Sequence, residues 1–349
     1  MQIYILKTVA KCISFIMVFS LLSACVHLNK HQTPSAKSEP EKNQNNSKDK
    51  PKSKAKKKWM SVPDISGIAP MGADTYLVVH DAKAHKVDKP RIGIVKINRE
   101  TEKLKYKALA FSNGPDPITS DLEAICRLPD RPKEFLIMES GYWEGKYGRI
   151  FHIEIADKMV NLIHSEQLPD IEDDFEGMAC AEKSDGTVFV ILGQRGGEKT
   201  SADISARKGA LRFANYNPIS HAFTTPGTPV LIHAPNIWRD NALREITGLS
   251  LGADGTLWAS AAIDLDQDLG PFRSLVYGLG KIYPNAQNPF IASTTHKVWV
   301  MDGMKIEAVT SGFDGKSPSY GSEDEKLGGI WRELPKTPSL TLPVSQPTN

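Results

Sequence analysis

Five short segments of the chain place an oxygen-bearing side chain at the same point of a recurring apolar run. The segments are "PDISGIAPMG", "SDLEAICRLP", "DDFEGMACAE", "REITGLSLGA" and "MKIEAVTSGF". The shared position holds two hydroxyl and three carboxyl side chains, those of Ser66, Glu123, Glu176, Thr247 and Glu307. Recurrence of one residue type at one point indicates that the fold uses these positions together.

Three carboxylates brought close together repel one another unless they are protonated, paired with basic side chains or bridged by a cation. Carboxylate and hydroxyl oxygens suit Ca²⁺, which takes about six to eight oxygen ligands, and no imidazole or thiolate occupies the shared position. We therefore predict one Ca²⁺ ion bound by the five residues. The alternative is that the glutamates are structural and bond backbone N–H groups or basic side chains of the neighbouring repeat.

The spacing of the repeats predicts the elements that would position these side chains. Successive copies are 57, 53, 71 and 60 residues apart, which suits a propeller blade of four strands. Each copy is followed by short runs rich in β-branched and aromatic residues, separated by Gly, Pro and Asp turns. We predict an all-β fold with a single five-bladed propeller over residues 59–335. Six blades are the alternative, because the interval of 71 residues has room for a degenerate blade.

The fifth repeat is shorter than the others. It offers "KIEAVTS", "PSYGSE" and "GGIWREL", and then the proline-rich end of the chain begins. The segment "KWMSV" directly before the first copy is predicted to supply the missing fourth strand, which would close the ring and remove an exposed edge. In a closed propeller the first strand of every blade lines the central channel, so the five shared positions would meet around one axis.

The repeated motifs resemble those of two propeller families. "DLEAI" and "DFEGM" resemble the motif of the extracellular phytase-like propellers, named for an esterase-like activity of phytase. The order Ser, Glu, Glu, Thr, Glu is similar to the channel ring of the calcium-activated nucleotidases, or apyrases. The resemblance implies that the five residues are calcium ligands and that the protein hydrolyses a phosphoester. Where the nucleotidases have an Asp-Asp-Arg-Thr-Gly run, this chain has "HDAKAHK", which keeps Asp81 and lacks the arginine.

The loops that leave the predicted second strands would form the rim above the channel. There Asp81 and Glu139 are candidate general bases, and Arg195 is a candidate clamp for an oxyanion. Two classes of function follow. The first is a calcium-dependent hydrolase acting on a phosphorylated small molecule. The second is a non-catalytic binding or scaffold propeller of the cell envelope, in which calcium is structural.

The N-terminus has the pattern of a bacterial lipoprotein signal. Residues 1–24 combine Lys7 and Lys11 with the apolar run "CISFIMVFSLL", which is typical of a signal-peptide core. The run ends in Leu-Ser-Ala-Cys, which resembles a lipobox and implies lipidation of Cys25 and anchoring to a membrane. Val26 in place of Asp favours the outer membrane. The alternative is a plain secretion signal with an incidental cysteine.

Composition predicts that both ends of the mature chain lack a core. Residues 25–58 are predicted to form a disordered, Lys-rich tether with almost no large apolar side chains, and residues 336–349 are predicted to be unstructured. Residues 1–58 hold twelve of the 43 basic and three of the 41 acidic residues, which leaves a net charge of −7 on residues 59–349. That sign disfavours nucleic acid and is compatible with cations. We expect a monomer. Cys126 and Cys180 form either one disulfide or two buried thiols.

Overall fold

The computed structural model describes residues 62–141, 146–167, 174–196, 209–240, 242–263, 270–323 and 328–344. These residues form strands, turns and connecting segments, with no helix among them, and therefore no helix of membrane-spanning length. The all-β prediction is confirmed.

The described strands form five antiparallel sheets, one for each repeat. Blade one contains β1 (Gly67–Pro70), β2 (Thr75–Val79), β3 (Ile92–Ile97) and β4 (Leu104–Leu109). Blade two contains β5 (Leu122–Arg127), β6 (Glu134–Glu139), β7 (Arg149–Ala156) and β8 (Met159–Gln167). Blade three contains β9 (Phe175–Glu182), β10 (Val188–Gln194), β11 (Ala210–Asn217), and the short β12 (Ala222–Phe223) and β13 (Val230–Leu231), which both pair with β11.

The last two blades depart from the four-stranded pattern. Blade four contains β14 (Leu243–Leu251), β15 (Thr256–Ile263), β16 (Arg273–Ile282) and β18 (Thr295–Asp302), with the short β17 (Phe290–Ala292) on β16 and β22 (Leu340–Pro343) on β18. The described part of blade five contains β19 (Ile306–Ser311), β20 (Pro318–Ser322) and β21 (Trp331–Glu333).

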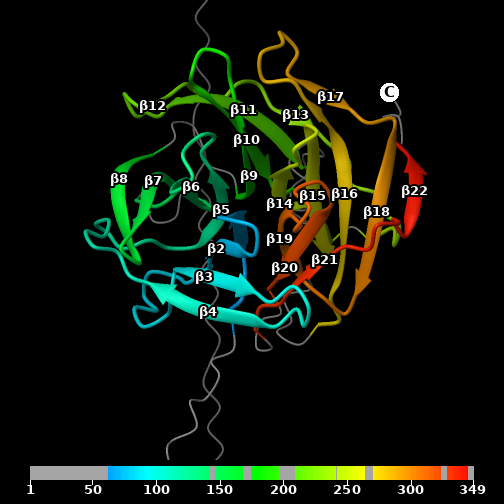
Figure 1. Ribbon diagram of the computed structural model, residues 1–349. Coiled ribbons are helices and arrows are strands. Elements are labelled where there is room, and N and C mark those ends of the chain that lie inside the picture. The colour runs from blue at the N-terminus through cyan, green and yellow to red at the C-terminus, as the bar shows by residue number, and fades with distance from the viewer. Residues whose placement is uncertain are drawn as a thin grey trace, which may run out of the picture. The chain divides into compact units, whose positions relative to one another are not determined.

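The five sheets surround a common axis, with the first strand of each innermost (Figure 1). Each inner strand contacts the next around the whole ring, from β1 through β5, β9, β14 and β19 back to β1. The five-bladed prediction is therefore confirmed, and the six-bladed alternative is wrong. The long third interval holds β12, β13 and their connections rather than a further blade.

The predicted closing strand lies largely outside the described residues. Of this segment, residues 58–62, only Val62 is described, and it belongs to no strand. The Val62 carbonyl accepts a hydrogen bond from the Gly329 N–H at 2.9 Å, and the Ile65 N–H donates to the Ser322 carbonyl at 3.0 Å. These bonds join the start of blade one to blade five, and Ile65 packs in the same apolar cluster as Trp331.

The predicted unstructured tail needs a correction. Leu340–Pro343 form β22, which pairs antiparallel with β18 from Thr295 to Val298. Pairing satisfies backbone groups that an uncovered edge of β18 would leave open, and Leu342 packs against the core of blade four. Low apolar content along the whole tail hid this short alternating run.

The inner strands approach one another so closely that only small residues fit beside the axis. A Cβ atom on Gly248 would lie 2.5 Å from the Glu307 carbonyl oxygen, and one on Gly67 would lie 2.7 Å from that of Glu123. Real Cβ contacts are longer than this. The residue after each shared position is accordingly Gly or Ala in all five repeats.

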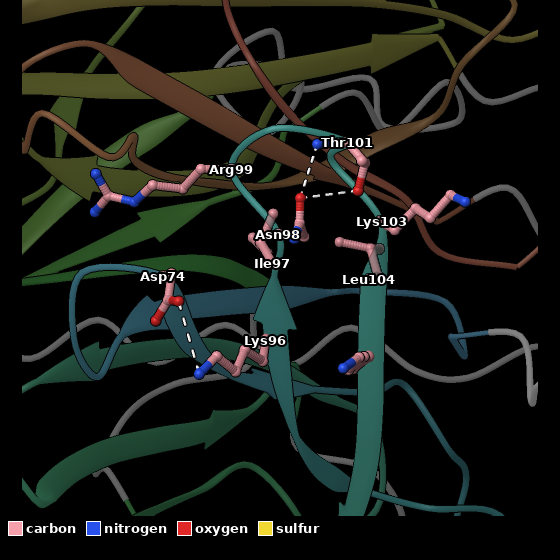
Figure 2. Close-up of a pocket in the computed structure, with 9 residues that line it drawn as sticks. Asp74, Lys96, Ile97, Asn98, Arg99, Thr101, Lys103 and Leu104 are labelled. Atoms are coloured by element: carbon pink, nitrogen blue, oxygen red, sulfur yellow. Dashed lines mark hydrogen bonds and ion pairs between the residues drawn. The ribbon is translucent and has the colours of Figure 1, made fainter.

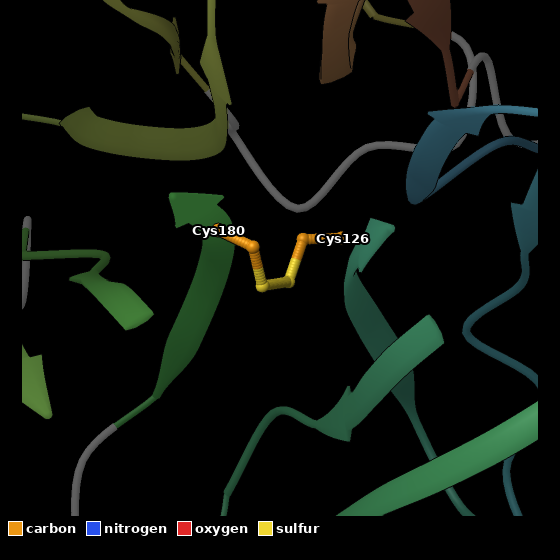
Figure 3. Close-up of a disulfide and its surroundings, with 2 residues drawn as sticks. All are labelled: Cys126 and Cys180. Carbon is orange, nitrogen blue, oxygen red and sulfur yellow. A yellow bond between two sulfur atoms is a disulfide. The ribbon is translucent and has the colours of Figure 1, made fainter. Parts of the chain in front are cut away.

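A disulfide joins the inner strands of blades two and three (Figure 3). It connects Cys126 of β5 to Cys180 of β9, with 5.7 Å between the Cα atoms. Of the two alternatives left by the sequence, the structure contains the bonded one. The bridge lies three residues after Glu123 and four after Glu176, so it ties together two of the acidic positions.

Candidate metal centre in the channel

The inner strands of all five blades enclose one small cavity. Its lining includes four of the five predicted ligands, Ser66, Glu123, Glu176 and Glu307, together with the glycine that follows the fifth. Its volume is about 10 Å³, which is close to the minimum that holds one water molecule. Residues up to 241 positions apart in the sequence thus meet at one point on the axis.

A bulge places each glutamate on the axis. In β5 the pairing with β6 passes from Leu122 to Ala124 and leaves out Glu123. Glu176 of β9 and Glu307 of β19 are left out in the same way. A bulged residue is not constrained by the ladder and can turn its side chain. The three glutamates therefore recur at the shared position because β5, β9 and β19 each have a bulge there. The sequence pattern does not reveal these bulges.

Glu123 carries the least compensated charge of the ring. Glu123 is only 7% exposed, and its Oε2 has no hydrogen-bond partner among the described residues. The Ser66 hydroxyl is buried and likewise unpartnered there. Burial, followed by the negative charges of Glu176 and other acids, raises the pKa of Glu123 well above its usual value. Two buried oxygens without partners at one cavity indicate room for a cation.

Glu176 is partly compensated by Arg195. The Arg195 Nη1 donates to Glu176 Oε1 at 3.2 Å, and its Nη2 forms an ion pair with Asp174. The Ser140 hydroxyl donates to the same Glu176 oxygen at 3.3 Å. Burial nevertheless raises the pKa of Glu176 to about 7, against the lowering effect of Arg195.

Glu307 belongs to a buried group that includes a lysine and a further glutamate. The Lys305 Nζ lies 3.1 Å from Glu307 Oε1 and 3.4 Å from Glu323 Oε1. Glu323 directly follows β20 and is 4% exposed. Carboxylate oxygens of Glu123, Glu307 and Glu323 lie within 4.8 Å of one another, which is close enough for one ion to contact all three.

Glu323 was missed by the sequence analysis, although a signal for it exists. Its N–H donates to the Lys305 carbonyl at 2.8 Å, just as the Arg195 N–H donates to the Asp174 carbonyl at 3.0 Å and the Ser140 N–H to that of Asp121 at 2.9 Å. The three residues thus occupy equivalent places after their second strands. Aligning "PSYGSE" with "TVFVILGQR" by that strand end would have found the glutamate.

Thr247 takes a different role from its four counterparts. Its hydroxyl donates to the Ile306 carbonyl at 2.7 Å and lies 3.0 Å from Ser260 Oγ. It is absent from the cavity lining, where Gly248 takes the place beside it. The bulge in β14 spans more residues than the others, so the threonine joins blades four and five instead of facing the cavity.

Two of the three predicted catalytic residues lie in ion pairs. Glu139 accepts from Arg149 Nη2 at 2.7 Å and Nε at 3.0 Å, and from the N–H groups of Ser120 and Arg149 at 2.9 Å and 3.0 Å. The prediction of a general base at Glu139 is corrected, because both oxygens are saturated and its side chain is fully buried. Arg195 is 23% exposed at the side chain and lies beside Glu176.

Asp81 lies close enough to the channel carboxylates to act on them electrostatically. It follows β2, is half-buried, and its negative charge raises the pKa of both Glu123 and Glu307. Lys83 nearby forms an ion pair with Asp121. Among the described residues Asp81, unlike Glu139, is in no ion pair, and it is therefore the remaining candidate for a general base.

A larger cavity than that of the channel lies elsewhere. It measures about 610 Å³ and follows the turn between β3 and β4 of blade one (Figure 2). Lys96, Arg99, Lys103 and Lys105 line it, and Lys96 faces Asp74 at 3.8 Å. It contains none of the predicted site residues.

The donor set of the channel fits a hard divalent cation. Carboxylate and hydroxyl oxygens are the side-chain polar atoms of the cavity lining, and Lys305 and Arg195 are basic side chains that contact them. Glu123 Oε2 and Ser66 Oγ are unpartnered in the described structure. Neither imidazole nor thiolate contributes to the cavity lining. Calcium suits such a set better than a soft metal.

No protein-family model matches the chain, and no curated protein matches it in sequence. Solved structures similar to it include a thermostable family-43 glycoside hydrolase, with 12% identity, a TM-score of 0.48 and coverage of 83% of this chain and 95% of that one. An exo-beta-1,3-galactanase from Phanerochaete chrysosporium has 10% identity and a TM-score of 0.47, over 78% of this chain and 61% of that one. An endo-arabinase from Bacteroides thetaiotaomicron has 10% identity and a TM-score of 0.44, over 83% and 96%. Similarity at this level says nothing about activity.

Proposed function

We propose that the propeller binds one Ca²⁺ ion in its channel and hydrolyses a phosphoester at the channel mouth, as a lipoprotein of the cell envelope. The observation that carries the proposal is the pair of buried, unpartnered oxygens, Glu123 Oε2 and Ser66 Oγ, beside further buried carboxylates. Burying such a charge without a partner is costly, and a bound cation removes that cost.

Five residues would hold the ion directly. These are Ser66, Glu123, Glu176 and Glu307, with Glu323 added from the structure, while Thr247 supports the strand beside them. A bound Ca²⁺ supplies positive charge that attracts and polarises a phosphoryl oxygen. Asp81, whose charge acts on Glu123 and Glu307, would accept a proton from the attacking water. Arg195 would meet the anionic substrate, because its side chain reaches both the ring and the solvent.

A release assay on the full-length chain tests the hydrolase. Nucleoside di- and triphosphates, phytate and a generic phosphodiester are offered with Ca²⁺ and with a chelator. We expect phosphate release on at least one class, lost with the chelator and reduced at least tenfold in Asp81→Asn. The melting temperature of Asp81→Asn, compared with that of the natural chain, shows whether the variant is folded. Absence of turnover on every class would reject the hydrolase.

The second candidate is a non-catalytic envelope propeller with a structural Ca²⁺. The observation that favours it is that Glu139 and Arg195 are engaged in ion pairs, which leaves few free groups at the mouth. In that case Ca²⁺ raises the melting temperature while no substrate is turned over.

A further inference from the structure

Lys305 interrupts a repeated acidic position. Two residues before the shared position stand Asp64, Asp121, Asp174 and Glu245 in the first four repeats, and Lys305 in the fifth. Three of these four acids contact a basic side chain or an N–H group. Asp121 pairs with Lys83, Asp174 pairs with Arg195, and Glu245 accepts from the Gly209 N–H at 2.5 Å. Blade five alone has a positive charge there.

The lysine is buried against the carboxylates of the channel. It is 4% exposed, and its Nζ lies 3.1 Å from Glu307 and 3.4 Å from Glu323. Its carbonyl accepts the Glu323 N–H at 2.8 Å, so backbone and side chain both hold it beside the same residue. A surface lysine would sample many positions, whereas this one is fixed.

The same two carboxylates belong to the group whose oxygens lie within 4.8 Å of one another. A divalent cation that contacts Glu307 and Glu323 would therefore share its ligands with the ammonium group. Two positive charges at such separation repel strongly in a buried site. The ammonium group and the ion would therefore compete for the same two carboxylates.

We propose that the Lys305 ammonium is a built-in counter-ion of the channel, which neutralises Glu307 and Glu323 until a divalent cation displaces it. The inference rests on the Ca²⁺ site proposed above and adds what sets its affinity. The lysine stabilises the metal-free channel and weakens ion binding, so that binding is reversible. Glu123, which has no such partner, is the carboxylate that the lysine does not neutralise.

Calorimetric titration of the full-length chain with Ca²⁺ tests this inference. Lys305→Met removes the charge and keeps most of the side-chain volume, and it is expected to tighten Ca²⁺ binding at least tenfold. The same variant is expected to lower the metal-free melting temperature and to enlarge its rise with Ca²⁺. Lys305→Arg keeps the charge and is expected to change Ca²⁺ affinity less than threefold.

Lys83→Met is the matched control. It removes one positive charge from the channel mouth, yet Lys83 pairs with Asp121 and not with Glu307 or Glu323. It is expected to change Ca²⁺ affinity less than threefold. If Ca²⁺ affinity rises equally in Lys83→Met and Lys305→Met, the effect is one of net charge alone, and the counter-ion proposal is wrong.

A double variant covers the case in which Lys305→Met does not fold. Lys305→Met combined with Glu323→Gln removes one charge of each sign and is expected to recover the metal-free melting temperature. The control combines Lys305→Met with Asp254→Asn, which removes a carboxylate in the turn between β14 and β15. The proposal is contradicted if Glu323→Gln restores the melting temperature no more than Asp254→Asn does.

The outcomes separate this inference from the proposed function. Binding of Ca²⁺ to the natural chain with no gain in Lys305→Met overturns the counter-ion and leaves the Ca²⁺ site standing. Binding only in Lys305→Met supports the counter-ion and rejects Ca²⁺ as the natural ligand. Binding in neither overturns both.

Discussion

At the scale of single residues, burial decides the chemistry of the channel. Glu123, Glu176 and Glu307 each have a pKa raised by burial, and only the last two have a basic side chain in contact. A carboxylate in this setting either binds a proton or binds a cation. The burial on which the proposed cation site rests therefore also makes the ring sensitive to pH.

Glu123→Gln is the single substitution that tests the proposed Ca²⁺ site most directly. It removes the one ring carboxylate with an unpartnered oxygen and keeps the shape of the side chain. We expect the rise of melting temperature with Ca²⁺ to disappear, and the metal-free protein to be as stable as before or more stable by about 1 kcal/mol. Scanning calorimetry with and without Ca²⁺ measures both. An unchanged calcium effect would place the ion elsewhere.

The pH dependence of stability follows from the raised pKa values. Glu176 has a pKa of about 7 in the folded protein and 4.5 as its ordinary value, so the folded state holds a proton that the unfolded state has released. The contribution of Glu176 to the free energy of unfolding of the metal-free protein is therefore fully present below pH 4.5 and is lost as the pH rises toward 7. Melting curves between pH 5 and 8 should show this decline.

Calcium reverses the trend, because the ion needs the deprotonated carboxylates. We expect its stabilising effect to grow from pH 5 to 8, and Glu176→Gln to flatten the metal-free decline. A metal-free melting temperature that rises across this window would contradict the assignment of Glu176.

At the scale of elements, inner strands with a repeated bulge and a following small residue build the site. The bulge frees the glutamate from the ladder, and Gly or Ala lets the neighbouring strand approach. The disulfide adds a covalent link between two of these strands, β5 and β9, close to Glu123 and Glu176. Blades two and three are therefore joined covalently as well as by packing.

Removing the disulfide should destabilise the propeller without changing its fold. Cys126 and Cys180 are 54 residues apart, and a loop of that length supports a contribution of about 2–4 kcal/mol. We expect Cys126→Ala with Cys180→Ala to lower the melting temperature by roughly 5–10 °C. A reductant should lower that of the natural chain similarly and leave the double variant unaffected. Equal sensitivity of both would show that the bond contributes nothing.

At the scale of the whole molecule, the ring of inner strands is what brings distant residues to one point. Contact between β19 and β1 closes the ring, and bonds from Val62 and Ile65 to blade five secure the junction. β22 covers the edge of β18 on the outside of blade four. The folded part, with its net negative charge, is proposed to be held to the envelope by residues before it.

Anchoring through Cys25 is tested on the whole chain. Cys25 lies outside the described residues, and its lipidation stays a prediction. We expect the natural chain to take up labelled palmitate and to sediment with the outer-membrane fraction. Cys25→Ser should lose the label and shift to the soluble fraction. Cys12→Ser is the matched control and should keep both properties, and label retained in Cys25→Ser would reject the anchor.

The sequence by itself predicted a propeller, favoured five blades over six, and identified most of the residues that line the channel cavity. Five copies of one short run, at intervals suited to four strands, suffice because every blade has the same local strand order. The equivalence of Ser66, Glu123, Glu176 and Glu307 was therefore visible without coordinates. Repetition carries this information, since each copy alone is too short to be specific.

Only the tertiary structure decided which side chains are free to act. It bonded Cys126 to Cys180, turned Thr247 toward Ile306, saturated Glu139 with Arg149, and brought Glu323 and Lys305 to the axis. Bulges and side-chain pairing between residues distant in the chain set these outcomes. They depend on backbone register and on which neighbour each buried charge finds, and neither is encoded in the spacing of a repeat.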